Sequence, residues 1–299
     1  LKSLDIESIR KAKLKIVIDY SYSTAVNIFP SILGELGIEV ISLNAFVDSS
    51  KIVRSESQLK YALEQLSNIV TTLDADIGFM LDNSAERIYI VDDKGKILEP
   101  QLSSMIVLLL VLNSIMEEKC KIVVPVYISN VVKEVVKMSH KNVEIVWSKT
   151  LPRYLREEAQ KTNVKFVVDA LGGYIFPEFQ PAFDGMFAIG KIIELLSQQE
   201  TKISRIKREI PDFSVEHLRI PCGWEKKGFV IRKLIEEHTE CKLELIDGVK
   251  IWINDTDWVL VLPDPDEAFV HLYVEAQKEK DTTKLVNEYF KKLNEWIKE

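Results

Sequence analysis

Short runs of β-branched and other apolar residues alternate along the chain with longer segments whose apolar residues recur at helical spacing. Leu14–Asp19 is typical, because an apolar, β-branched run that ends in an acid predicts a buried parallel strand. Strands are expected at residues 14–19, 38–43, 76–81, 87–91, 122–126, 143–146 and 165–168. Helices are expected in a stretch ending at Leu36 and at 57–73, 101–116, 131–138, 152–161 and 185–196. This alternation predicts α/β layers with parallel strands and right-handed crossovers.

The pattern changes after about Pro211. A helix at 224–238 comes before four short strands, at 242–246, 249–253, 258–262 and 269–275, and a helix at 283–297 follows them. Asp247-Gly248 is typical of a tight hairpin turn. A run of strands flanked by helices predicts a separate α+β domain.

Composition narrows the class of protein. The chain has 299 residues, of which 46% are apolar and 28% charged, and its formal net charge is -7. A chain this apolar can bury enough surface to fold, which excludes disorder. A net negative surface repels phosphate backbones, so no nucleic-acid partner is expected. Only 11 residues are Gly, which leaves few positions for loops that wrap phosphate with bare backbone.

Several common features are not expected from the sequence. The widely spaced Cys120, Cys222 and Cys241 predict neither a disulfide framework nor a zinc site and favour a cytoplasmic location. The longest apolar run, Met105–Leu112, has eight residues where a membrane span needs about 20. The four histidines form no metal or catalytic-triad motif. Because the chain begins at Leu1 with an amphipathic stretch, we expect it to be part of a longer polypeptide.

Three stretches carry a family likeness: Asp74–Arg87 with Val91–Gly95, then Gly173–Gly185, then Asp247–Trp252 with 258–276. In this order they resemble the second, third and fourth domains of the α-D-phosphohexomutases, the family of phosphomannomutase and phosphoglucomutase. The likeness is colinear from about residue 5 to the C-terminus. The family's first domain, which carries its phosphoserine, has no counterpart here.

The resemblance implies an α/β fold. Two mixed, three-layer α/β domains of phosphoglucomutase type would precede a smaller α+β domain similar to the TATA-box-binding protein. The expected domains are 1–117, 118–208 and 209–299. In each of them one functional loop departs from the family pattern, and these loops are 82–87, 167–173 and 262–268.

The first of these loops corresponds to the family's magnesium loop, D-G-D-A-D. Asp82 keeps its identity, Asn83 and Ser84 replace the Gly and the second acid, and Glu86 replaces the third acid. The resemblance implies at most a weak Mg²⁺ site at Asp82 and Glu86, because hard oxygen ligands suit that ion. The interpretation we favour is a turn between two strands in which Arg87 pairs with Asp82 or Glu86.

The second loop corresponds to the sugar-reading loop G-E-x-S-G-H. Asp169 stands at the Glu and Leu171 at the Ser, and an apolar Leu cannot bond a sugar hydroxyl. Asp169 is either a remaining sugar contact or, as we favour, a carboxylate that caps nearby amides. Lys149 and Arg156 lie where the family has a basic sugar-phosphate loop, although both are also typical of exposed surface positions.

The third loop corresponds to the phosphate loop R-P-S-G-T-E-P, which reads L-P-D-P-D-E-A at residues 262–268. Leu262 replaces the Arg, two acids replace the hydroxyls, and Pro265 replaces the Gly and removes an amide hydrogen. Carboxylates in these positions repel a phosphate dianion. No catalytic residue is therefore assigned to the chain, and no cofactor is expected beyond a weak Mg²⁺.

Two functions remain open. One is a catalytically degenerate mutase-like module, a structural or regulatory part of a sugar-nucleotide enzyme. Sequences of this kind resemble the tail that follows the nucleotidyltransferase domain in fusions of the mannose-1-phosphate guanylyltransferase type. The other is a phosphohexomutase whose phosphoserine domain lies outside this chain. The sequence upstream of Leu1 would discriminate them.

The module hypothesis places function on packing surfaces. The expected partners are upstream domains of the same polypeptide, a partner chain or a second copy of this chain. Aromatic residues in polar surroundings are candidate anchors, namely Tyr20, Tyr22, Trp224 and Phe229. Tyr20 and Tyr22 could equally fill the cleft left by an absent substrate. The acids Asp264, Asp266 and Glu267 would steer a basic partner surface.

Overall fold

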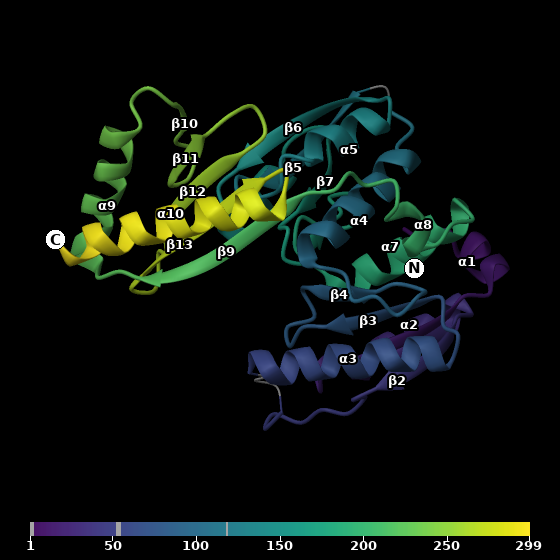
Figure 1. Ribbon diagram of the computed structural model, residues 1–299. Helices are drawn as coiled ribbons and strands as arrows, with labels where there is room; N and C mark the ends of the chain where they lie inside the picture. The colour runs from purple at the N-terminus through teal and green to yellow at the C-terminus, as the bar shows by residue number, and fades with distance from the viewer. Residues whose placement is uncertain (1–2, 52–54, 118) are drawn as a thin grey trace. The chain divides into compact units, whose positions relative to one another are not determined.

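The computed structural model describes residues 3–51, 55–117 and 119–299 (Figure 1). The chain divides into two compact units, each made of several segments. Unit 1 contains Leu1–Val124, Lys133–Val146 and Leu151–Ile210. Unit 2 contains Pro125–Val132, Trp147–Thr150 and Pro211–Glu299. The expected boundaries at 117/118 and 208/209 stay predictions.

Two four-stranded sheets form the frame on which unit 1 is built. The first has the order β2-β1-β3-β4 and the second, whose outer strand β6 runs on into unit 2, the order β6-β5-β7-β8. In the first sheet β1 pairs in parallel with β2 and β3, and β4 is antiparallel to β3. The second sheet repeats this design, with β5 parallel to β7 and β8 antiparallel to β7. The strands are β1 (Lys15–Asp19), β2 (Glu39–Leu43), β3 (Ile77–Leu81), β4 (Ile88–Val91), β5 (Lys119–Pro125), β6 (Asn142–Ser148), β7 (Val164–Val168) and β8 (Tyr174–Ile175).

Local chemistry explains three of the helix ends in unit 1. Ser55 and Gln58 form a capping box at the start of α3, and the Asp184 carboxylate accepts from the Phe187 amide at the start of α7. Gly37 ends α2 with a φ of +71°. The helices are α1 (Ile6–Ala12), the 3-10 helix η1 (Thr24–Asn27), α2 (Phe29–Leu36), α3 (Glu56–Thr72), α4 (Pro100–Ser114), α5 (Val132–Met138), α6 (Pro152–Ala159), α7 (Gly185–Gln198) and α8 (Ile203–Ile206).

Helix packing explains the unusual composition of α4. Helix α3 packs its apolar face against β1, β3 and β4, whereas α4 contacts α7, β4 and β7. Every residue of α4 from Ser103 to Leu112 is buried. A helix covered on all sides has no polar face, and the apolar run in the sequence therefore belongs to a core helix. Among the described residues, no helix is long and apolar enough to cross a membrane.

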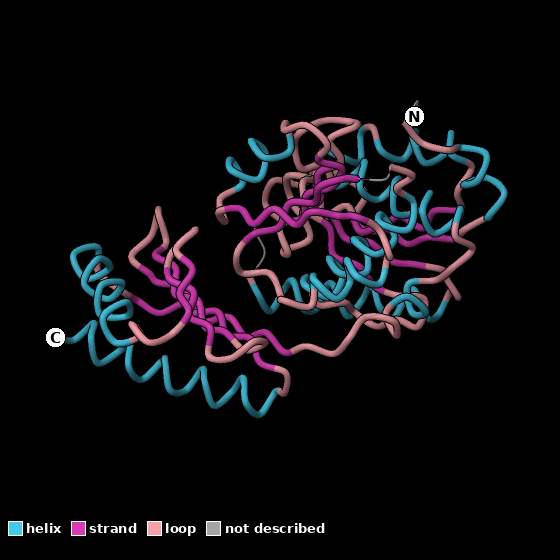
Figure 2. The backbone as a smooth tube through the Cα atoms, turned by 90° about the horizontal axis from the view of Figure 1, so that it is seen from above, coloured by secondary structure: helices cyan, strands magenta, loops and turns pink. Residues whose placement is uncertain are grey.

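Unit 2 is built on an antiparallel five-stranded sheet with the order β10-β11-β12-β13-β9. Its strands are β9 (Ser214–Pro221), β10 (Lys242–Glu244), β11 (Val249–Trp252), β12 (Trp258–Pro263) and β13 (Phe269–Ala276). Helices α9 (Trp224–Glu237) and α10 (Glu279–Lys298) lie on the same face of this sheet (Figure 2). The core between them is aliphatic on the sheet side.

The structure adds elements that periodicity did not predict. Strand β9 is the largest of them, and α1, β8 and α8 are short. Each residue of β9 pairs with β13 alone, at the edge of the sheet. Its exposed positions carry polar side chains such as His217 and Arg219, so the segment is too polar to be identified as a strand from hydrophobicity.

Candidate functional site

The loop that corresponds to the family's metal loop is closed by its own hydrogen bonds. Asp82 follows β3, and its Oδ1 accepts from the backbone amides of Glu86 at 2.8 Å and Arg87 at 3.1 Å. Its Oδ2 accepts from the Ser84 hydroxyl at 3.0 Å. Ala85 has a φ of +56°, which turns the backbone toward β4. Both carboxylate oxygens of Asp82 thus hold the turn together.

Arg87 pairs with a residue of the second sheet. Its Nε donates to Asp169 Oδ2 at 2.7 Å, and its guanidinium lies 6.0 Å from the centre of the Phe183 ring. The sequence did not suggest Asp169 as a partner of Arg87, and the expected pairing of Arg87 with Asp82 or Glu86 stays a prediction. The pair connects two loops that are 82 residues apart in the sequence.

Asp169 organises the loop that corresponds to the sugar-reading loop. It follows β7 and is only 2% exposed. Its Oδ1 accepts from the backbone amides of Leu171 at 2.8 Å and Gly173 at 2.7 Å. With Arg87 on Oδ2, this buried carboxylate is surrounded by donors, as burial of a charge requires. Asp169 therefore caps the amides of its own loop, and a sugar contact by Asp169 stays a prediction.

Backbone contacts join the same two loops. The Ile88 amide donates to the Gly172 carbonyl at 2.9 Å, and Arg87 forms an isolated antiparallel bridge with Gly173. Gly172 has a φ of +95°, and a Cβ built there would lie 2.3 Å from the Ile88 carbonyl oxygen. Glycine is therefore required by both backbone conformation and space.

Leu171, Lys149 and Arg156 are the other positions that align with the family's substrate loops. Leu171 is 46% exposed and offers no polar group. Lys149 is exposed in unit 2, whereas Arg156 is exposed on α6 of unit 1 and its Nε donates to the Pro152 carbonyl at 3.4 Å. The structure thus brings Asp82, Arg87 and Asp169 into one connected pair of loops.

The residues present do not fit the magnesium ion of the family. Both oxygens of Asp82 accept hydrogen bonds within the loop, and Glu86 is exposed. Within the described parts of the chain, no group of three or more His, Cys, Asp or Glu side chains is placed to hold a metal ion. Mg²⁺ needs near-octahedral oxygen ligation, which one occupied carboxylate does not supply.

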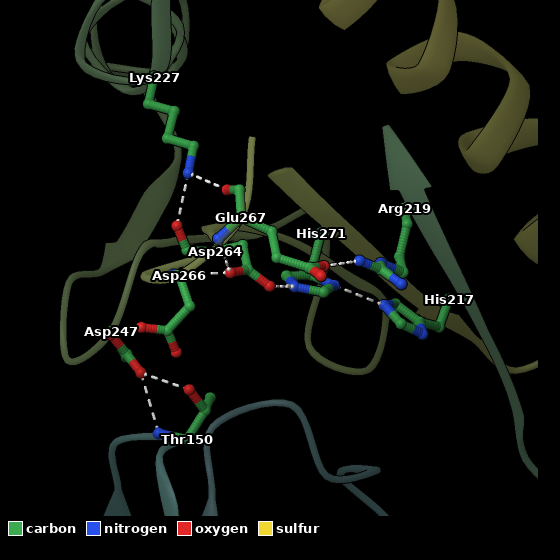
Figure 3. Close-up of polar contacts among 9 residues, drawn as sticks. All are labelled: Thr150, His217, Arg219, Lys227, Asp247, Asp264, Asp266, Glu267 and His271. Atoms are coloured by element: carbon green, nitrogen blue, oxygen red, sulfur yellow. Dashed lines mark hydrogen bonds and ion pairs between the residues drawn. The ribbon is translucent and has the colours of Figure 1, made fainter. Parts of the chain in front are cut away.

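The loop that corresponds to the phosphate loop lies between β12 and β13 and is folded onto Asp264 (Figure 3). Asp264 Oδ1 accepts from the amides of Asp266 at 2.8 Å and Glu267 at 2.7 Å. Its Oδ2 lies 2.9 Å from His271 Nε2. Backbone amides that could face a phosphate are thus bonded to a carboxylate of the chain itself.

Cationic side chains of unit 2 neutralise part of this loop. The Lys227 ammonium donates to the carbonyl oxygens of Asp264 and Glu267, and Arg219 forms an ion pair with the Glu267 carboxylate (Figure 3). The Arg219 guanidinium also lies 4.4 Å from the centre of the Phe269 ring. Asp266 is exposed. The negative charge that this loop offers a basic partner is therefore smaller than the sequence suggested.

Two histidines extend the contacts of Asp264. His217 Nε2 lies 2.9 Å from His271 Nδ1, and the His217 ring stacks on Tyr273 with 4.2 Å between centroids. With the proton of each ring on Nε2, His217 donates to His271 Nδ1 and His271 donates to Asp264 Oδ2. Burial lowers the pKa of His217 from 6.5 to about 4, with the neighbouring His271 and Arg219 acting in the same direction.

Sequence reasoning missed this histidine pair. His217 and His271 are 54 residues apart, and only the register of β9 against β13 places them on one face. The sequence held only a weak signal of this pair. Polar or aromatic residues stand at every second position of the two strands, at 217 and 219 in one and at 269, 271 and 273 in the other, and alternate residues of a strand share a face.

Unit 2 should lose stability as the pH falls from 6.5 to 4. The folded protein keeps His217 neutral down to about pH 4, whereas the unfolded chain binds a proton near pH 6.5, so acidification in this window favours unfolding. His217→Gln removes this contribution, so its stability should fall less over the same interval. The His217 ring loses water where it stacks on Tyr273, but the residue as a whole is exposed, so the difference is expected to be modest.

Urea unfolding followed by tryptophan fluorescence at pH 7 and pH 5 measures this difference. All five tryptophans belong to unit 2, so fluorescence reports on that unit alone. His140→Gln, in unit 1, is the matched control and should behave as wild type. Equal pH dependence in wild type and His217→Gln would contradict the assignment.

The candidate aromatic anchors differ in exposure. Tyr20 is fully buried and meets Phe29 edge-on, so of the two roles weighed for it the exposed anchor is excluded and the space-filling role remains. Tyr22 is half-buried, and Phe229 packs partly against the core of unit 2. Trp224 is 56% exposed, and the Lys227 ammonium lies 3.6 Å from the centre of its ring.

Two sequence-family models match the chain. Residues 1–95 match phosphoglucomutase/phosphomannomutase, alpha/beta/alpha domain II, and residues 103–213 match alpha/beta/alpha domain III of the same family. The curated relatives include a probable phosphoglucosamine mutase of Methanosarcina barkeri, 30% identical over 90% of this chain and 60% of the relative. The phosphoglucosamine mutase of Methanocaldococcus jannaschii is 28% identical over 99% of this chain and 65% of its own length. The chain thus spans less than two thirds of these relatives.

Solved structures show the same fold. A phosphoglucomutase/phosphomannomutase family protein from Burkholderia thailandensis superposes with a TM-score of 0.81 over 97% of this chain and 63% of its own, at 18% identity. A putative phosphomannomutase from Thermus thermophilus gives 0.74 over 98% of this chain and 64% of its own, at 16% identity. Similarity at this level of identity supports the architecture of the chain.

Proposed function

Because the chain belongs to the α-D-phosphohexomutase superfamily, we propose that it is a mutase-type module that does not itself transfer phosphoryl groups. The observation that carries this proposal is the state of the loop 262–268. The Asp264 carboxylate accepts hydrogen bonds from two amides of the loop, and Lys227 and Arg219 bind oxygen atoms of the loop. A loop with this arrangement has no set of donors directed at a phosphate.

Electrostatics support the same conclusion. A phosphate dianion entering this loop would meet the carboxylates of Asp264, Asp266 and Glu267. Each like-charge pair 4 Å apart costs about 1 kcal/mol in water and more where water is excluded. Arg219 and Lys227 offset part of this cost, but they would have to exchange their present partners for the ligand. Binding of a sugar phosphate through this loop is therefore unfavourable.

The module then acts through its surfaces, as a structural or regulatory part of a sugar-nucleotide enzyme. The type we propose is the mannose-1-phosphate guanylyltransferase, on the basis of the sequence resemblance. Its partner would be a further domain of the same polypeptide, a separate chain or a second copy. Trp224 is the exposed aromatic candidate for such a contact.

The alternative is a phosphohexomutase completed by a phosphoserine domain outside this chain. The names of the relatives favour it, since they include phosphoglucosamine mutases. Arg87 and Asp169 also remain near each other, where they could contact a sugar. Under this alternative the loop 262–268 would reorganise when a sugar phosphate arrives.

Calorimetric titration of the whole chain with glucosamine 6-phosphate, mannose 6-phosphate and inorganic phosphate tests the proposal. No saturable binding is expected with a dissociation constant below about 1 mM. Mixed with the bisphosphate activator, the chain should not interconvert hexose or hexosamine 1- and 6-phosphates above a no-protein control. Removing a single charge-stabilising donor already costs about 100- to 1000-fold in rate.

Two results would favour the alternative instead. One is saturable sugar-phosphate binding that weakens in Lys227→Met. The other is turnover that cosediments with the chain. Lys226→Met is the matched control for the first result, because Lys226 neighbours Lys227 in α9 and its ammonium lies over the Phe229 ring.

A further inference from the structure

Two histidine side chains meet on neighbouring strands of unit 2 (Figure 3). His217 on β9 is paired with Tyr273 on β13, and His271 stands two residues before Tyr273, so both histidines lie on one face of the sheet. His217 Nε2 and His271 Nδ1 are 2.9 Å apart. Because imidazole is the commonest metal ligand among the side chains, two ring nitrogens that face each other form a candidate metal site.

Asp264 determines which nitrogen of His271 is available to an ion. Its Oδ2 lies 2.9 Å from His271 Nε2, and an ionised carboxylate only accepts hydrogen bonds. The neutral ring therefore carries its proton on Nε2, which leaves a lone pair on Nδ1, the atom that faces His217. Metal-bound histidines are oriented in the same way, by a carboxylate that accepts from the ring nitrogen that does not bind the ion.

The His217 ring is oriented by stacking. It lies on the Tyr273 ring with 4.2 Å between centroids and 8° between planes. Tyr273 is buried, so the surface on which His217 rests has a fixed position. Because His217 is exposed and the side chain of His271 is 16% exposed, an ion can reach the pair from solvent and bind water at its remaining positions.

The separation of the two ring nitrogens suits a single ion. A metal–nitrogen bond to histidine is about 2.0–2.1 Å long. Two such bonds at a right angle place their nitrogens about 2.9 Å apart, and two bonds at a tetrahedral angle place them about 3.3 Å apart. Small rotations of the rings therefore reach either geometry from the present 2.9 Å, and the backbones of β9 and β13 keep their positions.

The charges around the histidine pair are compatible with a cation. Arg219 is the cation that acts on His217, and it forms an ion pair with the Glu267 carboxylate. The Asp264 carboxylate is in direct contact with His271. A divalent ion on the other nitrogen of that ring would be attracted by this carboxylate, while the charge of Arg219 is already compensated.

We propose that His217 Nε2 and His271 Nδ1 bind one divalent late transition-metal ion, with Asp264 as the positioning residue. Imidazole nitrogens suit Ni²⁺, Cu²⁺ and Zn²⁺, whereas Mg²⁺ prefers oxygen ligands. Two protein ligands are one fewer than a catalytic zinc site has, so water completes the coordination and the ion exchanges with solvent. This inference does not depend on the proposed function, because it requires neither the presence nor the loss of phosphoryl transfer.

Binding replaces the proton between the two rings with the ion. The Nε2 proton of His217 transfers through water to Nδ1 of the same ring, so each imidazole binds in its neutral form and no net proton is released. The ion then links β9 to β13 and, through the contact of His271 with Asp264, to the loop 262–268. Because the unfolded chain does not hold the two histidines together, the ion stabilises folded unit 2.

Calorimetric titration of the whole chain with NiCl₂ tests the proposal. The protein is prepared without a histidine tag and freed of metal with a chelator that is then removed. One saturable site is expected. Loss of a residue that only orients a ligand weakens metal binding by about 10- to 100-fold, so Asp264→Asn should weaken it by about 10-fold. His217→Gln and His271→Gln each remove a ligand and should weaken it by more than about 10-fold.

His140→Gln is the matched control, since His140 is exposed in unit 1 and its loss should leave the affinity for Ni²⁺ at the wild-type value. Tryptophan emission before metal is added verifies that unit 2 is folded in each variant. If His271→Gln does not fold, His217→Gln decides, because His217 is exposed.

Nuclear magnetic resonance of the histidine ring nitrogens identifies the ligand atoms. On addition of ZnCl₂ the signals of His217 Nε2 and His271 Nδ1 should shift as their lone pairs bind the ion, and those of His140 should not. A variant that is merely less stable does not produce this pattern. Wild-type affinity for Ni²⁺ in folded His217→Gln, or ZnCl₂ shifts confined to other nitrogens, would overturn the proposal.

Discussion

Replacing Gly172 with alanine is expected to lower the free energy of unfolding of unit 1 by about 3 kcal/mol. A left-handed conformation costs an L residue about 1–2 kcal/mol, and overpacking adds about 1–3 kcal/mol. Both costs apply, because Gly172 has a φ of +95° and its Cβ would lie 2.3 Å from the Ile88 carbonyl oxygen. Ile88 cannot withdraw without losing its hydrogen bond to the Gly172 carbonyl.

Gly34→Ala is the matched control, since a Cβ at Gly34 meets nothing within 4 Å. Gly34 lies inside α2, where alanine should stabilise the helix by about 0.5–1 kcal/mol. Thermal or guanidinium unfolding should be followed by far-UV circular dichroism, because unit 1 contains no tryptophan. Equal stability of Gly172→Ala and wild type would show that loops 82–88 and 169–173 do not pack as described.

Asp169→Asn is expected to destabilise unit 1 by about 2 kcal/mol. The substitution keeps the shape of the side chain but turns an amide N–H₂ toward the Arg87 Nε–H, or else toward the amides of Leu171 and Gly173. Breaking a fully buried ion pair costs about 3–5 kcal/mol. The Arg87 side chain is 32% exposed and can be rehydrated, so we expect about 2 kcal/mol, less than the cost for a fully buried pair.

Glu86→Gln provides the comparison for this prediction. Glu86 is exposed and adjoins Arg87 in sequence, and surface substitutions of this kind stay within about 0.5 kcal/mol of wild type. The same circular dichroism measurement applies to both variants. If Asp169 were kept as a sugar contact without a structural role, Asp169→Asn would unfold at the wild-type denaturant concentration.

Elements with strong periodicity were predicted well. The strand expected at 14–19 is β1 (Lys15–Asp19), and the helix expected at 57–73 is α3 (Glu56–Thr72). These segments bury one face or both in a core, which imposes a period on the apolar residues. Strand β9 was not predicted, because an edge strand with polar residues at its exposed positions shows no clear period of apolar residues.

The candidate sites were predicted in part. The family likeness located the loops at Asp82, Asp169 and residues 262–268. The sequence also showed which residues in these loops differ from the ligands and hydrogen-bond donors of the family pattern. It did not show that Arg87 would bind Asp169 or that Lys227 would bind the third loop. Pairings between distant segments depend on how the sheets are connected, which no local pattern contains.

The sequence by itself determined the α/β class and the family, because these depend on residue identity and on periods of two and 3.6 residues. Only the tertiary structure decided which charges compensate one another. Asp169 with Arg87 and Lys250 with the Val126 carbonyl join positions 82 and 124 residues apart. A buried charge is stable only with partners at hydrogen-bonding distance, and that distance exists only once strand register and loop contacts are formed.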